Sequence, residues 1–202
     1  LPLLTDKRPL VCAESQTETD ESTPSIPQVT PHHIDDLLYG IPRYIWMSAP
    51  SYDALCESYK DHIWDLMQRA LGWEVFFVSD QRMQVMVSKH CSEREQMCFS
   101  RINPKYGPAK ADFARCLLMR LYGGLWLDLK SGWQGDLSKN LSKFGPLPPL
   151  VLGHWGWPSQ HEHIPQDVHN YGEIQQWWLM SAPGHAMWDK ALAAVCDNIK
   201  KD

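Results

Sequence analysis

The chain has 202 residues, of which 44% are hydrophobic and 21% charged, which is the ordinary balance of a globular domain with a sizeable core. Its net charge of −5 is mildly acidic, and no basic cluster marks a nucleic-acid-binding surface. No apolar run approaches the roughly 18 residues that a membrane-spanning helix needs.

Residues 1–36 are predicted to form an extended arm that is rich in proline and polar side chains. They hold seven acidic and two basic residues, which accounts for the whole net charge of −5. The stretch from Glu14 to Thr23 has no apolar residue, so it cannot bury enough surface to offset its ordering entropy. Alone, the arm is therefore expected to be disordered, and we expect it to take up a fixed position only when the body of the chain or a protein partner holds it. Residues 37–202 are expected to form the domain.

The domain is predicted to open with a strand, a helix and a second strand. The strand covers 41–48, and Ser51 or Asp53 is a candidate cap for a helix that ends near Leu71. The second strand, 74–80, ends in the carboxylate of Asp80. This order predicts parallel strands joined by a right-handed crossover.

The rest of the chain is predicted to continue as an α/β protein. We expect a short helix and a loop over 81–107, a helix over 109–122, a strand over 125–129, a further strand over 147–152, a histidine- and tryptophan-rich loop over 153–172, either a helix or a strand over 172–180, and a final helix over 186–200. Six cysteines include no C-x-x-C pair, and a Cys91–Cys98 disulfide is left open. P-loop, G-x-S-x-G and G-x-G-x-x-G sequences are absent, which leaves nucleoside triphosphatases, α/β hydrolases and dehydrogenases unsupported.

The stretch 111–130, ADFARCLLMRLYGGLWLDLK, is the most informative part of the sequence. Asp112 and Arg115 lie one helical turn apart, so their side chains can pair. The predicted helix ends before two glycines, and an apolar strand then runs directly into Asp128. This places a carboxylate at the end of a strand, where α/β folds bind their ligands.

This arrangement resembles the DXD-type glycosyltransferases of family 32 and of the capsular polysaccharide sugar-transferase kind. Their pattern reads Asp, two residues, Arg, a helix, Tyr-Gly-Gly, a strand, and Asp-x-Asp. Weaker resemblances lie at Ile41-Pro42, at 135–137 and at 183–185, so that the likeness covers about 41–200 and is specific at 111–130. It implies a GT-A-like, Rossmann-like α/β fold with a mixed, mostly parallel sheet flanked by helices. Family members continue further, so the acceptor-side part is expected to be short or missing.

The resemblance also implies roles for individual residues. Asp128 would bind the diphosphate of a nucleotide-sugar through Mn²⁺ or Mg²⁺, since carboxylates suit such cations. The donor would further contact Asp80, Asp112, Arg115, Tyr122, Gly123 and Gly124, and the acceptor side would include Glu173 and His185. Most of these residues also have a structural alternative. Asp112 and Arg115 could form an ion pair that holds the helix to the sheet, Tyr122 could pack in the core, and Gly123 and Gly124 could form a tight turn with positive φ. Glu173 could be solvated on the surface, and His185 could cap a helix or pack.

Lys130 departs from the family pattern, because it stands where the second aspartate is expected. Two unit charges about 4 Å apart interact by about 4 kcal/mol at an effective dielectric constant of about 20. A divalent ion beside an inward-pointing Lys130 would therefore meet repulsion of about 8 kcal/mol. Three interpretations remain open: Lys130 replaces the metal at the diphosphate, it points away and leaves Asp128 to act alone, or the site has decayed.

Two functions follow from these observations. The first is a glycosyltransferase that moves a sugar from a nucleotide-diphospho-sugar to an acceptor hydroxyl. The second is a catalytically inactive glycosyltransferase-like subunit of a larger complex, organellar or membrane-associated, because exposed tryptophans suit an interface. An active enzyme would be expected in the secretory-pathway lumen, and a subunit in an organelle after removal of a leader.

Overall fold

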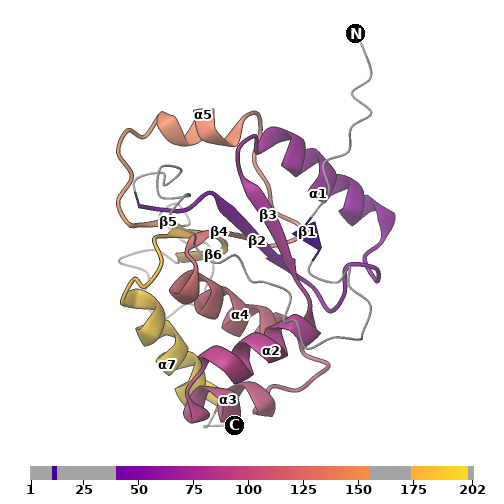
Figure 1. Cartoon of the computed structure of the whole chain (residues 1–202), viewed down its shortest axis with the longest axis vertical. Coiled ribbons are helices and arrows are strands. Elements are labelled where there is room, and N and C mark those ends of the chain that lie inside the picture. The colour runs from indigo at the N-terminus through magenta and orange to yellow at the C-terminus, as the bar shows by residue number, and fades with distance from the viewer. Residues whose placement is uncertain (1–10, 13–39, 155–173, 200–202) are drawn as a thin grey trace, which may run out of the picture.

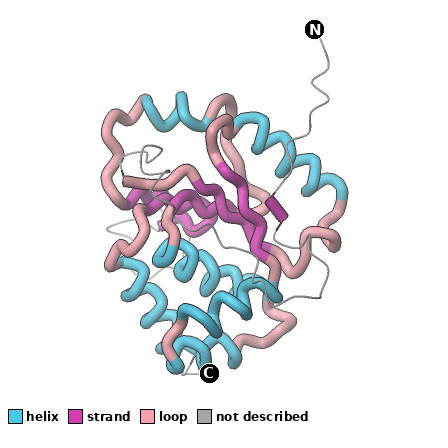
Figure 2. The backbone as a smooth tube through the Cα atoms, viewed as in Figure 1, coloured by secondary structure: helices cyan, strands magenta, loops and turns pink. Residues whose placement is uncertain are grey.

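The computed structural model describes residues 11–12, 40–154 and 174–199. In these segments the chain forms one six-stranded sheet with helices on both faces (Figures 1 and 2). Its elements are β1 (Val11–Cys12), β2 (Tyr44–Ser48), α1 (Glu57–Arg69), β3 (Glu74–Val78), α2 (Asp80–His90), α3 (Glu93–Arg101), α4 (Gly107–Leu121), β4 (Gly124–Leu127), α5 (Leu137–Ser142), β5 (Leu150–His154), β6 (Ile174–Ser181) and α7 (Met187–Ile199).

The sheet is mixed and mostly parallel, as predicted. The strand order is β1-β3-β2-β4-β6-β5, in which the first four strands are parallel and β6 is antiparallel to both neighbours. The short strand β1 comes from the predicted arm and pairs with β3 at the edge of the sheet. The rest of the arm lies outside the described residues, so the boundary between arm and domain stays a prediction.

Each face of the sheet has its own core because strand side chains alternate between faces. Trp46 and Trp126 point toward α2, α3, α4 and α7, which form one helical layer. Leu125 and Leu127 point to the opposite face, where α1 and α5 cover them. The candidate functional site described below lies on the face that α4 covers. Among the described helices, none is long and apolar enough to cross a membrane.

Two predicted elements are corrected by the structure, and a third that was left open is decided. Helix α1 begins after Cys56 rather than at Ser51 or Asp53, and Ser51 instead accepts a hydrogen bond from the Ala54 amide. Residues 80–101 form two helices rather than one short helix and a loop, because Ser79 and Ser92 each cap a helix start. The segment over 172–180 is resolved as the strand β6 from Ile174 onward.

The turn between α4 and β4 requires both of its glycines. Gly123 and Gly124 have φ of 62° and 95°. A Cβ atom on Gly123 would lie 2.5 Å from the Ser181 carbonyl oxygen, and one on Gly124 would lie 2.6 Å from the Tyr44 carbonyl oxygen. The tight turn therefore lets β4 enter the sheet between β2 and β6. Because the turn sets where β4 begins, it also sets where the carboxyl end of β4 lies in the sheet.

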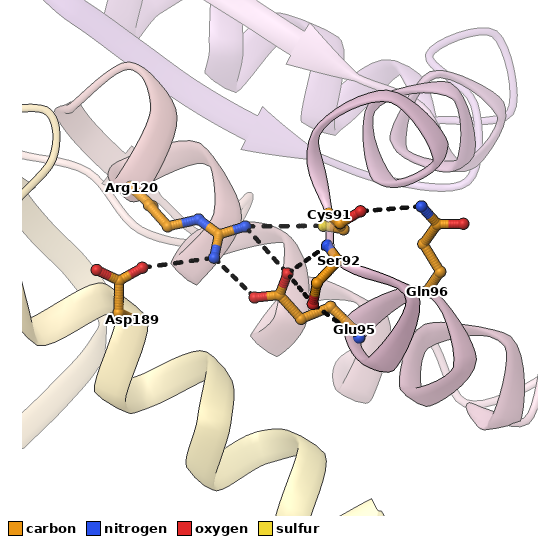
Figure 3. Close-up of polar contacts among 6 residues, drawn as sticks. All are labelled: Cys91, Ser92, Glu95, Gln96, Arg120 and Asp189. Carbon is orange, nitrogen blue, oxygen red and sulfur yellow. Dashed lines mark hydrogen bonds and ion pairs between the residues drawn. The ribbon is translucent and has the colours of Figure 1, made fainter.

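A polar junction holds the far end of α4 to its neighbouring helices (Figure 3). The guanidinium of Arg120 donates to Glu95 Oε1 at 2.7 Å and lies 3.5 Å from Asp189 Oδ1 on α7. Glu95 Oε2 accepts the Ser92 amide at 2.8 Å, completing a capping box on α3. Burial alone raises the pKa of Glu95, but hydrogen bonds from Arg120 and Ser92 outweigh it and leave this pKa below its usual value.

Candidate functional site

Arg115 is the buried centre of the candidate site, with 7% of its surface exposed. It extends from α4 toward the antiparallel strand β6. Its Nη2 lies 2.8 Å from Asp112 Oδ1, and its Nη1 donates to the Gln176 carbonyl oxygen at 2.6 Å. A buried cation costs free energy unless it is paired and hydrogen-bonded, and this arginine is both.

Asp128 follows β4 and reaches the same guanidinium. Its Oδ1 lies 3.7 Å from Arg115 Nη2 and accepts a hydrogen bond of 2.8 Å from Trp126 Nε1. The indole of Trp126 in turn lies under the guanidinium, whose Cζ is 5.4 Å from the ring centroid. Asp128 directly follows the strand that holds Trp126, and its amide still donates to the Trp177 carbonyl oxygen at 3.1 Å, so the period of two puts both side chains on the same face.

The structure thus brings together Asp112, Arg115 and Asp128, three residues of the sequence motif. Burial is the main cause of a raised pKa at Asp112; the charge of Asp128 adds to it and Arg115 opposes it. Both carboxylates remain partly open, with 47% of the Asp112 side chain and 38% of the Asp128 side chain exposed. Asp112 Oδ2 and Asp128 Oδ2 receive no donor from the described residues, so they can accept hydrogen bonds from a ligand.

Lys130 is exposed, in a turn closed by a 2.8 Å hydrogen bond from the Ser131 amide to the Asp128 carbonyl oxygen. Within the described segments it makes no ion pair. The turn is fixed from the opposite face of the sheet, where His62 Nε2 of α1 lies 2.9 Å from the Ser131 carbonyl oxygen. Lys130 is therefore an exposed cation on an anchored turn, two residues after Asp128, with no ion-pair partner among the described residues.

Asp80 belongs to a second group of residues, on the wall of a neighbouring cavity. The cavity has a volume of about 190 Å³ and lies between the segments that follow β2 and β3, the first turns of α4, and Leu129. Lys110 Nζ of α4 lies 2.5 Å from Asp80 Oδ2. Asp80 is the first residue of α2 rather than the last residue of β3. The cavity opens beside the carboxyl ends of parallel strands, the usual ligand position in α/β folds.

The other predicted donor residues lie at the opposite end of β4. Tyr122 is buried and packs on Trp46, with ring centroids 5.4 Å apart, and burial raises its pKa to about 12. Gly123 and Gly124 form the turn described above. These contacts agree with the structural alternatives, and a donor contact for the three residues stays a prediction.

Of the two predicted acceptor-side residues, only His185 can be placed. Its Nδ1 accepts the Met187 amide at 3.3 Å at the start of α7. Glu173 lies outside the described residues, as does most of the loop over 153–172. Their roles at an acceptor stay predictions.

The residues around Asp128 do not fit a divalent metal. In the segments that the structure describes, no three His, Cys, Asp or Glu side chains are grouped as metal ligands. A cationic side chain, Arg115, lies between Asp112 and Asp128, and Lys130 follows in place of a second acid. A divalent cation would have the Asp112 and Asp128 carboxylates as ligands there, and both already face the positive charge of Arg115.

Sequence reasoning missed three side chains of the site. Trp126 could have been found, because a polar indole N–H two residues before Asp128 must share its face. Gln176 and Lys110 carried no usable signal, since their partners Arg115 and Asp80 lie 61 and 30 positions away.

The comparisons with known proteins agree with this geometry at the level of the fold. No family model and no curated protein matches the sequence. Among solved structures, the chain is similar to one described as "PaToxG Glycosyltransferase", with a TM-score of 0.57 and 13% sequence identity over 80% of this chain. The match spans 62% of the length of that chain. This protein therefore has a glycosyltransferase-like α/β fold.

Proposed function

We propose that the chain is a glycosyltransferase-type domain that binds a nucleotide-diphospho-sugar at the end of β4 and transfers its sugar to an acceptor hydroxyl. The observation that carries the proposal is the convergence of Asp112, Arg115 and Asp128 beside a cavity in a glycosyltransferase-like fold. Motif residues that served only the fold would not need two half-exposed carboxylates held at one guanidinium.

The contacts support an orienting role for Arg115 and a ligand-binding role for Asp112 and Asp128. Arg115 already donates to the Ala111 and Gln176 carbonyl oxygens and faces both carboxylates, so its part is to orient Asp112 and Asp128. The free carboxylate oxygens can accept hydrogen bonds from sugar or ribose hydroxyls, which are good donors. Fixed acceptors of this kind hold the donor in one orientation, and orientation supplies much of the rate of a group transfer.

The test is binding of a panel of nucleotide-diphospho-sugars, measured by thermal shift with and without Mn²⁺. A ligand at 100 times its Kd stabilises the folded state by about 2.7 kcal/mol, which raises the Tm by roughly 5–10 °C for a domain of this size. Asp112→Asn and Asp128→Asn should each abolish most of that shift. Asp197→Asn, an exposed carboxylate paired with Arg94 on the surface, is the matched control. If no donor shifts the folded protein, the transferase proposal fails.

A second candidate function is an inactive, glycosyltransferase-like subunit that works through protein contacts. It is supported by Lys130 in the place of an acid and by Arg115, whose positive charge already partly neutralises Asp112 and Asp128. It predicts that no donor binds and that the full chain co-purifies in a stoichiometric complex, which native mass spectrometry of the protein from its own cells would detect. Loss of that complex on deletion of 1–36 would assign the contact to the arm.

A further inference from the structure

The charge around Asp128 differs from that of a metal-dependent diphosphate site. Asp112 and Asp128 each have an oxygen facing Arg115, at 2.8 Å and 3.7 Å from Nη2. Asp128 Oδ1 also accepts the Trp126 indole N–H. A divalent ion at this position would lie beside the buried guanidinium of Arg115, with no third carboxylate grouped there among the described residues to compensate.

Lys130 lies at the same end of β4 and supplies a positive charge that needs no metal ion beside the Arg115 guanidinium. It is exposed and has no carboxylate partner in the described segments, so its ammonium is available to a ligand. The turn that carries it is closed by the Ser131–Asp128 hydrogen bond and anchored by His62. An ammonium on a fixed turn is a good point charge for phosphate.

The cavity extends this arrangement from the other side. Leu129, between Asp128 and Lys130, contributes to its wall, and Lys110 lies across it with its ammonium held by Asp80. Asp128 and Lys130 are therefore both direct neighbours in the chain of a residue of the cavity wall. The wall of the cavity is mostly apolar, and Lys110 is the lysine that lines it among the described residues.

We propose that the site binds the diphosphate of a nucleoside diphosphate without a divalent metal, and that the Lys130 ammonium supplies the charge that a metal would otherwise supply. The proposal rests on the function proposed above and specifies how its donor is held. It makes Lys130 a ligand-binding residue of this chain rather than the mark of a decayed site.

The experiment is calorimetric titration of the full chain with UDP and with GDP, first in EDTA and then with Mn²⁺. We expect one nucleotide to bind in EDTA with a Kd that Mn²⁺ changes by less than about twofold. Lys130→Ala should weaken this binding by about tenfold or more, because it removes a charge-assisted hydrogen bond to the diphosphate. The corresponding nucleoside, which lacks the diphosphate, should bind the wild type and Lys130→Ala equally.

Two further variants sharpen the test. Lys190→Ala removes an exposed lysine on α7 with the same change of net charge, and it should leave the Kd within about twofold, because surface charges far from a ligand are screened by salt. Lys130→Asp recreates the acidic pair of the family pattern. It should lose binding in EDTA and regain part of it only when Mn²⁺ is present. Because Lys130 is exposed, Lys130→Ala and Lys130→Asp should each leave the Tm of the free protein unchanged.

The outcomes separate this inference from the proposed function. Binding that requires Mn²⁺ in the wild type, or equal Kd values for wild type and Lys130→Ala in EDTA, would overturn the metal-free site while leaving the transferase proposal intact. Absence of binding for every nucleotide in both conditions would overturn both.

Discussion

The guanidinium of Arg115 lies over the indole of Trp126, 5.4 Å from the ring centroid. The same indole donates its N–H to Asp128 at 2.8 Å. One buried aromatic side chain therefore fixes both a cation, by its face, and an anion, by its edge. This explains how a carboxylate at a strand end can stay partly exposed and still have a defined orientation.

Replacing Arg115 with alanine should destabilise the protein by about 2–4 kcal/mol, since it leaves Asp112 and the Gln176 carbonyl oxygen without their donor and Asp128 without its counter-charge. Arg115→Lys should recover only part of the loss, because one ammonium cannot reproduce the planar fork. Urea denaturation gives the free energy of unfolding.

The control for this prediction is Arg94→Ala, which removes an exposed arginine paired with Asp197 at 2.5 Å. Surface pairs of this kind contribute about 0–1 kcal/mol. A cost at Arg115 no larger than that at Arg94 would contradict the central position given to Arg115.

Gly123→Ala should be far more costly than Gly135→Ala, although both glycines have positive φ, 62° and 69°. An added Cβ at Gly123 would lie 2.5 Å from the Ser181 carbonyl oxygen, whereas one at Gly135 has nothing within 4 Å. Gly135→Ala should cost about 1–2 kcal/mol, the strain of the left-handed conformation alone. Gly123→Ala adds a backbone clash and should unfold the protein or lower its Tm much further. Similar Tm values for the two variants would rule out the close approach of β4 to β6.

Glu95 should stabilise the helical junction in a pH-dependent way. Its pKa is lowered in the folded state, so its contribution is fully present above the unfolded-state pKa, about 4.3, and is lost as the pH falls through the folded-state value. Glu95→Gln should therefore cost about 1–3 kcal/mol at neutral pH and progressively less below pH about 4. Unfolding curves across this range give the difference.

Glu93→Gln is the matched control for Glu95, because Glu93 is exposed in the first turn of the same helix. Its substitution tests only the helix-dipole interaction, about 0.3–1 kcal/mol. If both variants follow the same pH dependence, the Arg120–Glu95 contact is not the source of the effect.

The cysteines should differ sharply in reactivity. Hydrogen bonds from Ser58 and the Tyr59 amide lower the pKa of the exposed Cys56 thiol, whereas burial raises the pKa of Cys116 to about 11 and of Cys196 to about 12. The thiolate is the nucleophile, so iodoacetamide at neutral pH should modify Cys56 first and reach the two buried thiols only in denaturant. Peptide mapping over time checks this, and rapid labelling of Cys116 in the folded protein would contradict its burial on the core-facing side of α4.

Local sequence determined much of the fold, as particular residues show. The apolar strand entered through Gly123-Gly124 and followed by Asp128 is present as β4, because positive φ and alternation are local requirements. The parallel pairing of β2 and β3 follows from their helical crossover. Only one short helix was predicted where α2 and α3 form, although the capping box of Ser92 and Glu95 was visible in the sequence.

The site itself depended on contacts between distant parts of the chain. Sequence alone placed Asp112 and Arg115 one turn apart and Asp128 at a strand end, because helix and strand periods fix such local relations. Only the tertiary structure decided that Arg115 is buried against β6, where Gln176 accepts its hydrogen bond across 61 positions, and that Lys130 is exposed. These outcomes depend on β6 entering the sheet antiparallel beside β4, a choice made by packing of both sheet faces rather than by any local propensity.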